Sequence, residues 1–87
     1  MGLIGLARAL ASDFAGQNIR ANVVSPGSID TRRDNPELYQ GLPNAAGIPL
    51  GRQGHVDEIA ATCLFLVSDD GGFITGQAIH VNGGTGY

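Results

Sequence analysis

The order of three segments most constrains how this chain can fold: a strand-like run, an amphipathic helix and a second strand-like run. Residues 18–25 form a short β-like stretch that Pro26-Gly27 end abruptly, and residues 77–82 form another that ends in Gly83-Gly84. Between them, residues from about 56 to 68 have the apolar spacing of a helix. Two strands joined through a crossover helix are expected to be adjacent and parallel, with a right-handed connection.

Apolar side chains at helical spacing predict both helices of the chain. A first helix precedes residue 18, and Gly16 is a plausible stop for it. Its predicted apolar face consists of Leu3, Leu6, Ala7, Leu10 and Phe14. The predicted buried stripe of the second helix consists of Ile59, Cys63, Leu66 and Val67. The predicted order is therefore helix, strand, lid, helix, strand, an α/β arrangement in one unit over residues 1–87.

The lid is the long segment between the first strand and the second helix. Residues 28–54 show no sustained periodicity and are punctuated by prolines and glycines. A loop of this length inside a compact domain is usually a lid or a binding loop. We expect residues 32–54 to form such a substrate loop.

Composition and charge exclude several classes of partner. The chain has a formal charge of -3, contains five Arg and no Lys, and has no basic patch suited to nucleic acid or anionic lipid. No apolar run approaches the roughly 20 residues of a membrane span, and the first residues lack the cationic start of a signal peptide. A single cysteine excludes an internal disulfide and suits a reducing compartment. A cytoplasmic location is the expectation, with no nucleic acid and no membrane as partner.

Four stretches, in order and at consistent spacing, resemble the C-terminal portion of the short-chain dehydrogenases/reductases. Residues 18–31 are similar to that family's sixth strand with its Pro-Gly-x-Ile-x-Thr ending. Residues 51–54, 57–60 and 65–69 resemble the start and body of the helix that follows the substrate loop, and residues 74–77 and 80–84 resemble the last strand and its glycine end. Asn82 departs from the family's usual Asp. Among subfamilies, the chain resembles most the 3-oxoacyl-acyl-carrier-protein reductase and sugar or alcohol dehydrogenase group.

The resemblance implies a fold and a cofactor site. The fold would be the C-terminal part of a Rossmann-type doubly wound parallel sheet, whose ligands bind at the carboxyl ends of the strands. The cofactor would be NAD or NADP, and the sequence does not distinguish them. Pro26, Gly27, Ile29 and Thr31 would bind it, with the backbone near Ile29 and the Thr31 hydroxyl at the nicotinamide carboxamide and neighbouring phosphate. Gly27 is free to take a positive φ and would let a flat ring approach the backbone.

Two parts of the family pattern are absent from this sequence. No Gly-x-x-x-Gly-x-Gly or Gly-x-Gly-x-x-Gly occurs, although that turn seats the cofactor pyrophosphate on a helix N-terminus. The acid/base pair, Tyr-x-x-x-Lys, is also missing: Tyr39 has Pro43 four residues on, and Tyr87 is terminal. Against the family pattern, Met1 falls directly after the missing Lys. No catalytic residue is therefore assigned, and the chain alone is expected to be inactive.

Several other residues have side chains capable of chemistry, but ordinary structural roles account for them. A hydrolase triad needs a serine, a histidine and an aspartate, and the candidates here are Ser25 or Ser28, His55 or His80, and Asp30. Neither serine lies in a Gly-x-Ser-x-Gly elbow. No metal site is predicted, since Cys63 lacks metal-ligand spacing to either histidine and is expected to pack in the core. Asp69-Asp70 is interpreted as the solvated end of a helix. Arg32-Arg33 could meet a phosphate or an acidic substrate, or be a solvated pair on the loop.

Two interpretations of function remain open. The first is part of an NAD(P)-dependent oxidoreductase that transfers hydride between a nicotinamide cofactor and a small carbonyl or alcohol substrate. The second is a non-catalytic oligomerisation or interaction module derived from the same fold. The expected protein partner is either a second copy, as a homo-oligomer, or a missing N-terminal half. The substrate itself has no decisive signal in the loop.

Overall fold

A computed structural model of the protein describes residues 2–31 and 47–86. Helix α1 spans Leu3–Phe14 and is extended by a 3-10 turn at Ala15–Gln17. The next elements are strands β1 (Val23–Pro26), β2 (Ile29–Asp30) and β3 (Gly54–His55), helix α2 (Val56–Val67), a 3-10 turn (Asp69–Gly71) and strand β4 (Ala78–Val81). The predicted order is confirmed, with two short strands added at the ends of the long loop. Residues 32–46 of the predicted lid lie outside the described residues.

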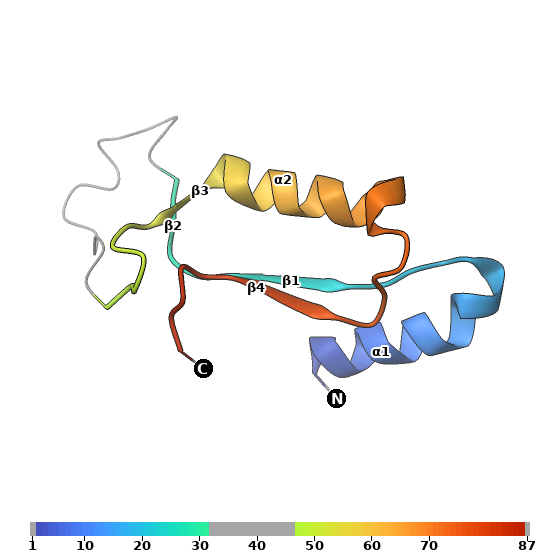
Figure 1. The fold of residues 1–87 in the computed structure, drawn as a ribbon. Coiled ribbons are helices and arrows are strands. Elements are labelled where there is room, and N and C mark those ends of the chain that lie inside the picture. The colour runs from blue at the N-terminus through green and yellow to red at the C-terminus, as the bar shows by residue number, and fades with distance from the viewer. Residues whose placement is uncertain (1, 32–46, 87) are drawn as a thin grey trace.

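The central prediction about the sheet is confirmed, because β1 pairs with β4 in parallel. The register runs from Val23 opposite Ala78 to Pro26 opposite Val81, and the two strands lie side by side in Figure 1. A second parallel pair was not predicted: β2 lies beside β3, with Ile29 opposite Gly54. Two-residue strands are too short to produce a periodic signal in sequence.

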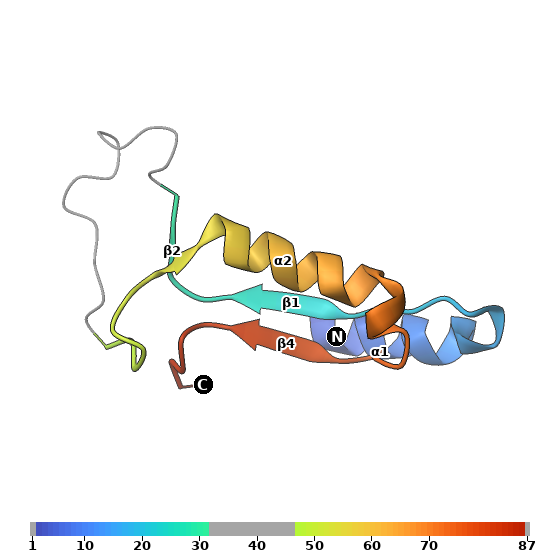
Figure 2. The same cartoon turned by 45° about the horizontal axis from the view of Figure 1, so that its top comes forward.

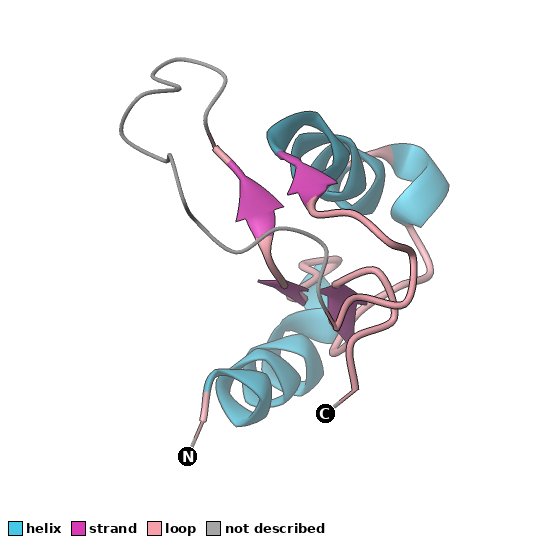
Figure 3. Ribbon diagram, turned by 90° about the vertical axis from the view of Figure 1, so that its left-hand side faces the viewer, coloured by secondary structure: helices cyan, strands magenta, loops and turns pink. Residues whose placement is uncertain are grey.

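The two helices lie on opposite faces of the β1–β4 pair. Figures 1 and 3 show α2 on one side of the strands and α1 on the other, so the described part of the chain has three layers. Turning the molecule leaves this arrangement evident (Figure 2). Only Ala7, Ala11 and Leu66 are buried hydrophobic side chains in the described residues. Three layers are therefore present, but the core between them is very thin.

The predicted apolar stripes are helical but are largely not buried. On α1, Ala7 and Ala11 are buried, whereas Leu3 is 67% and Leu6 is 47% exposed. On α2, only Leu66 of the predicted stripe is buried, and Val67 is 76% exposed. The expectation that Cys63 packs in the core is wrong, because its side chain is exposed. The helical period was right, but among the described residues the sheet beside each helix is two strands wide and does not cover the stripe.

Side-chain hydrogen bonds, together with one backbone bond from Gly76 N–H to Ala21 O at 2.7 Å, hold residues 20–22 against the end of α2 and the segment before β4. The Arg20 guanidinium donates to the carbonyls of Leu66 (2.6 Å), Ile74 (3.2 Å) and Ser68 (3.4 Å). The Asn22 side chain donates to Ile74 O (3.0 Å) and accepts from Gln77 N–H (3.0 Å). The predicted strand over 18–25 therefore begins only at Val23.

The first helix ends close to Gly16, as predicted, but the left-handed residue at the end of the following turn is Asn18. Gly16 lies within the 3-10 turn and is not in the left-handed region, whereas Asn18 has φ 58° and ψ 35°. Asn is one of the few non-glycine residues that tolerate this conformation, because its short polar side chain can hydrogen-bond locally. The Asn18 N–H donates to Ala15 O at 2.9 Å and closes the turn.

The helices of the described residues are short. Both α1 and α2 have 12 residues. Within residues 2–31 and 47–86, no helix has the length and apolarity needed to cross a bilayer.

Candidate cofactor site at the strand ends

Three segments meet at the carboxyl ends of β1 and β4, and together they form what we call the strand-end site: residues 26–31, 48–54 and 81–85. Gly27 N–H donates to Val81 O at 2.9 Å, which joins the first segment to the third. Leu50 N–H donates to Gly83 O at 3.0 Å, which joins the second to the third. Ligands of open α/β sheets bind outside this edge of the sheet. The three segments therefore lie at the edge of the sheet where the sequence predicted a cofactor site, and that site stays a prediction.

Gly27 is required by its contact with the end of β4. A β-carbon on Gly27 would lie 2.8 Å from Asn82 Cβ and 2.9 Å from Asn82 Cα, closer than real side chains come. Its φ is not in the left-handed region, since the described glycines with positive φ are Gly47, Gly51, Gly76, Gly83 and Gly84. The expected positive φ at Gly27 is therefore wrong. The space that a Gly27 side chain would need is occupied by Asn82. This space is therefore not open to a flat ring.

Asn82 itself is fixed by a turn at the end of β4. Its Oδ1 accepts the N–H of Gly84 at 2.9 Å, and its backbone carbonyl accepts the Thr85 hydroxyl at 2.9 Å. An amide oxygen accepts this bond as an aspartate would, but it carries no charge. The departure from the family's usual Asp therefore preserves the turn while removing a negative charge from the site.

The pairing of β2 with β3 determines the direction in which the backbone N–H and C=O of Ile29 point. Gly54 N–H donates to Ser28 O at 3.0 Å, and the Gln53 side chain donates to Ser28 Oγ at 2.8 Å. Because the peptide groups of a strand alternate in direction, those of Ile29 point away from β3. The Ile29 N–H and C=O therefore point to the side opposite β3. A ligand amide on that side would find one donor and one acceptor.

The hollow within the strand-end site is small. It has a volume of about 90 Å³ and is bordered by Ile29, Leu50, Val81 and Gly83, among other residues. Cofactor pockets typically have volumes of about 300–1,000 Å³. The hollow bordered by the described residues is therefore too small to enclose a dinucleotide.

The four predicted cofactor-binding residues fall into two groups. Pro26, Gly27 and Ile29 lie in the strand-end site, as the last residue of β1, the residue after it and the first residue of β2. Thr31 follows β2 and is exposed. It is the last residue of the first segment of the strand-end site and the last described residue before 32–46.

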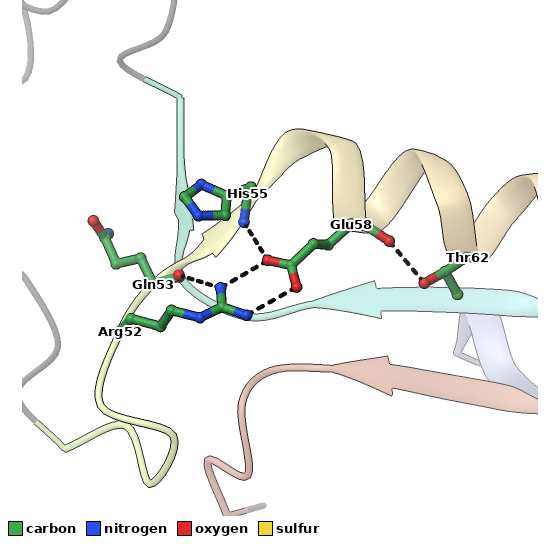
Figure 4. A network of polar contacts seen from close by, with 5 residues as sticks. All are labelled: Arg52, Gln53, His55, Glu58 and Thr62. Atoms are coloured by element: carbon green, nitrogen blue, oxygen red, sulfur yellow. Dashed lines mark hydrogen bonds and ion pairs between the residues drawn. The ribbon is translucent and has the colours of Figure 1, made fainter.

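An ion pair secures the second segment to α2. Arg52 binds Glu58 with both guanidinium nitrogens, Nη1 to Oε1 at 2.7 Å and Nη2 to Oε2 at 2.9 Å (Figure 4). The same Oε1 accepts the N–H of His55, the residue before α2, at 3.0 Å. Arg52 Nη1 also donates to Gln53 O at 3.0 Å. A single carboxylate thus satisfies one free N–H at the start of α2 and anchors the chain that leads into it.

These contacts hold Glu58 in its ionised form. The hydrogen bonds from Arg52, followed by the one from the His55 backbone, lower the pKa of the Glu58 carboxyl from 4.5 to about 2. Hydrogen bonding to Glu58 raises the pKa of Arg52 above its ordinary value. Both side chains remain nearly half exposed, 49% for Arg52 and 44% for Glu58, so water screens the attraction between them.

The alternative chemistries find no common site in the described residues. Ser25 is opposite His80 in the β1–β4 pair, and Asp30 is opposite His55 in the β2–β3 pair. The hydrolase candidates are thus divided between two sheets, and Ser28 Oγ accepts from Gln53. No group of three metal-ligating side chains occurs within the described ranges. Asp69 and Asp70 are exposed in the turn after α2, as expected. Arg32-Arg33 lie outside the described residues.

Sequence reasoning missed the two arginines that organise the chain. Arg20 and Arg52 each precede a short strand and have no oppositely charged neighbour at helical spacing, so no local pattern marked them. The available signal for the second was Glu58 in the first turn of a helix, a position at which a carboxylate commonly accepts a backbone N–H. For Arg20 the partners are carbonyls 46 to 54 residues away, which no local pattern reveals.

Comparison with known proteins connects this geometry to one family. Residues 1–86 match the family described as Enoyl-(Acyl carrier protein) reductase. The chain is 45% identical over 85 residues to the 3-oxoacyl-[acyl-carrier-protein] reductase FabG of Chlamydia trachomatis serovar D. It is 43% identical over 86 residues to the FabG of Escherichia coli K12. Each match covers 95% of this chain.

A solved structure shows the same arrangement of elements. A crystal structure of a protein assigned as a betaketoacyl-ACP reductase superposes with a TM-score of 0.79 and 38% identity, covering 94% of this chain and 35% of that one. The chain likewise spans about a third, 34%, of the length of the curated relatives. The likeness therefore covers nearly all of this sequence but a minority of each relative.

Proposed function

The chain belongs to the short-chain dehydrogenase/reductase family, and on that basis we propose that it supplies the nicotinamide-side wall of an NAD(P)-dependent reductase. The bound cofactor would supply a hydride for a carbonyl substrate, or accept one from an alcohol. The observation that carries the proposal is the strand-end site, where the turn after β1 meets the end of β4 through Gly27 and Asn82. A 3-oxoacyl thioester is the substrate class favoured by the names of the relatives.

The donors at this site suit a neutral carboxamide. The Ile29 peptide directs one donor and one acceptor away from β3, and the Thr31 hydroxyl follows two residues later. We infer that these groups orient the nicotinamide end of the cofactor, while Pro26 and Gly27 set the course of the backbone. The residues present therefore fit the group that the family implies.

The chain would act only together with other parts of a reductase. It contains no lysine and no Gly-rich phosphate turn. In the proposed reaction, a Tyr-x-x-x-Lys pair from outside this sequence would exchange the proton with the substrate oxygen. A lysine ammonium near the tyrosine lowers the pKa of the phenol, which makes that exchange possible near neutral pH. The 87 residues would contribute binding and orientation.

The alternative function is a non-catalytic module for assembly. The exposed apolar side chains of α1 and α2 favour it, because large exposed apolar surfaces commonly mark interaction sites. The two proposals are compatible, since a wall of a cofactor site must also bind the rest of its enzyme.

A matched pair of threonine variants tests the cofactor role. The protein is a fusion in which the preceding part of E. coli FabG is joined to this chain in place of the matched region. Thr31→Ala should raise the KM for NADH or NADPH about two- to twelve-fold, because one positioned hydrogen bond is lost. Thr62→Ala is the control, since its hydroxyl donates to Glu58 O within α2 at 2.8 Å. Equal cofactor KM values for both variants would contradict the assignment.

A further inference from the structure

We infer that Asn82 is a site of spontaneous modification, at which the folded turn after β4 promotes closure of the side chain onto the next peptide and its conversion to aspartate and isoaspartate. The reaction needs water and no enzyme. Asn82 belongs to the strand-end site, so the modification changes the chemistry of that edge of the sheet. The inference goes beyond the proposed function, because the reaction does not require hydride transfer or a bound cofactor.

The residue that follows Asn82 distinguishes it from the other asparagines. The sequence has five asparagines, and only Asn82 is followed by glycine. In ring closure, the backbone nitrogen of the next residue attacks the side-chain carbonyl carbon, and a side chain on that residue obstructs the attack. Asn18 and Asn22 are followed by isoleucine and valine, which are branched at the β-carbon. The backbone nitrogen of Gly83 carries no such obstruction.

The fold requires glycine at position 83. Gly83 has φ 66°, in the left-handed region that favours glycine. A β-carbon on Gly83 would lie 2.8 Å from Ile48 Cγ2 and 3.7 Å from Leu50 Cβ. Gly83 O also accepts the N–H of Leu50 at 3.0 Å, which holds the two segments together. A residue that would block ring closure therefore does not fit after Asn82.

The side chain of Asn82 is folded along the chain towards the peptide with which it would react. Its Oδ1 accepts the N–H of Gly84, two residues on, at 2.9 Å. This turn directs the side-chain carbonyl past the Gly83 nitrogen, where the main chain bends sharply beyond β4 (Figure 1). Asn82 and Gly83 are half-buried, so water reaches both. The reacting carbon and nitrogen thus lie on the same side of the turn.

Three hydrogen bonds are directed at the two oxygens on which negative charge develops during ring closure. Loss of the Gly83 amide proton leaves a charge shared with Asn82 O, which accepts the Thr85 hydroxyl at 2.9 Å and the Thr85 N–H at 3.3 Å. The attack then moves charge to Asn82 Oδ1, which already accepts the Gly84 N–H. Donors that are in place where charge develops stabilise a transition state. The turn therefore promotes the reaction in the way that an oxyanion hole does.

The reaction consists of ring formation followed by hydrolysis. Gly83 N gives up its proton to water or hydroxide and forms a bond to Asn82 Cγ. The bond between Cγ and Nδ2 breaks, and Nδ2 takes up a proton and leaves as ammonia. Water then adds to one of the two carbonyl carbons of the ring. Cleavage of the bond from nitrogen to Cγ gives aspartate, and cleavage of the bond from nitrogen to the backbone carbonyl carbon gives isoaspartate.

The two products have different consequences for the strand-end site. In aspartate, a carboxylate oxygen still accepts the Gly84 N–H, and a negative charge is added to the site. In isoaspartate, the main chain passes through the β-carbon and is one carbon longer. Asn82 Cβ and Cα lie 2.8 Å and 2.9 Å from the point where a β-carbon of Gly27 would stand, so the lengthened chain disturbs this contact.

The experiment follows residue 82 in the 87-residue chain and in the fused reductase, each incubated in neutral buffer and in guanidinium chloride. Peptide mass spectrometry measures the converted fraction over time, and water enriched in heavy oxygen labels the molecules that are hydrolysed during incubation. We expect Asn82 to convert in buffer at least as fast as in denaturant, because only the folded turn holds the donors in place. Asn22 should remain unconverted in buffer, because its side chain is bonded to Ile74 O and Gln77 N–H.

Threonine variants test the contribution of the turn. Thr85→Val removes the hydroxyl donor to Asn82 O at an exposed position. It should slow conversion in buffer about two- to twelve-fold, the effect of one lost hydrogen bond, and leave the rate in denaturant unchanged. Thr85→Ser keeps the donor and should retain the original rate. Thr62→Val is the matched control and should change neither rate, because the Thr62 hydroxyl donates to Glu58 O within α2.

Two results would overturn the inference. One is slower conversion in buffer than in denaturant in both proteins, which would mean that the fold protects Asn82. The other is an equal rate in buffer for Thr85→Val and Thr62→Val, which would mean that the turn does not assist ring closure. Neither result bears on the proposed hydride transfer, because conversion is measured by mass and not by reductase activity.

Discussion

Gly27 and Asn82 lie so close that no side chain fits between the ends of β1 and β4. The Cβ of Asn82 is 2.8 Å from the point where a β-carbon of Gly27 would stand, and the Asn82 Cα is 2.9 Å from it. The backbone N–H of Gly27 itself donates to Val81 O at 2.9 Å. Because of this bond, the backbone at Gly27 cannot easily shift away from β4. The strand-end site depends on this contact.

Gly27→Ala should therefore destabilise the fold by about 1–3 kcal/mol, the usual cost of forcing extra volume into a packed position. The midpoint of denaturant unfolding of the fused reductase measures it. Gly16→Ala is the control, because a β-carbon there would meet nothing within 4 Å and Gly16 does not have a positive φ. Equal midpoints for the two variants would show that the strand ends are not in close contact.

Arg20→Met should cost about 1.5–3 kcal/mol of unfolding free energy, the range for hydrogen bonds to a charged group. The substitution removes the donor to Leu66 O, Ser68 O and Ile74 O while retaining an apolar stem of similar length. Arg8→Met, at an exposed position of α1, is the matched control and should be nearly neutral. A small effect at both positions would show that the hydrogen bonds from Arg20 to these three carbonyls do not stabilise the fold.

The Arg52–Glu58 pair predicts a specific dependence of stability on pH. The pKa of Glu58 is about 2 in the folded protein and is ordinarily 4.5. Because the folded pKa is the lower one, the pair stabilises the protein above pH 4.5, and that contribution is lost as the pH falls towards 2.

Glu58→Gln should remove this dependence. The difference in unfolding midpoint between the original protein and the variant is expected to be largest at neutral pH and to shrink between pH 4.5 and pH 2. Denaturant titrations of the fused reductase at a series of pH values measure it. Parallel pH profiles for the two proteins would mean that Glu58 titrates normally.

The chain alone should associate. Leu3, Leu64 and Val67 are 67%, 69% and 76% exposed, and Phe73 is fully exposed. Burial of such side chains is worth about 1.5–3 kcal/mol each, which strongly favours covering them. We expect oligomers or aggregates in size-exclusion chromatography and binding of a dye specific for apolar surface. A compact monomer with a cooperative two-state unfolding transition would contradict this expectation.

The order of elements could be predicted because it depends on local patterns. Helical spacing identified α1 and α2, and Pro26-Gly27 marked the end of β1. Parallel pairing followed from the strand–helix–strand order, and the register of β1 on β4 bears it out.

The rest depends on contacts between distant residues. β1 begins late because Arg20 and Asn22 bind residues 66–77 through their side chains. The stripe residues Val67 and Cys63 are exposed because the sheet beside α2 has two strands in the part of the chain that the structure describes. At the strand-end site, the motif did not reveal why position 27 is a glycine, because the residue that fills the space beside it, Asn82, is 55 positions away in the sequence.

Hydride transfer by this chain, alone and fused to the preceding part of E. coli FabG, is the most direct test of the reductase assignment. Oxidation of NADH and NADPH would be followed with a 3-oxoacyl thioester and a panel of ketones. We predict no turnover by the 87-residue chain, which contains no lysine and no Gly-rich phosphate turn, and reductase activity in the fusion. Turnover by the chain alone, after host dehydrogenases are excluded, would contradict the assignment, and so would a folded fusion with no activity.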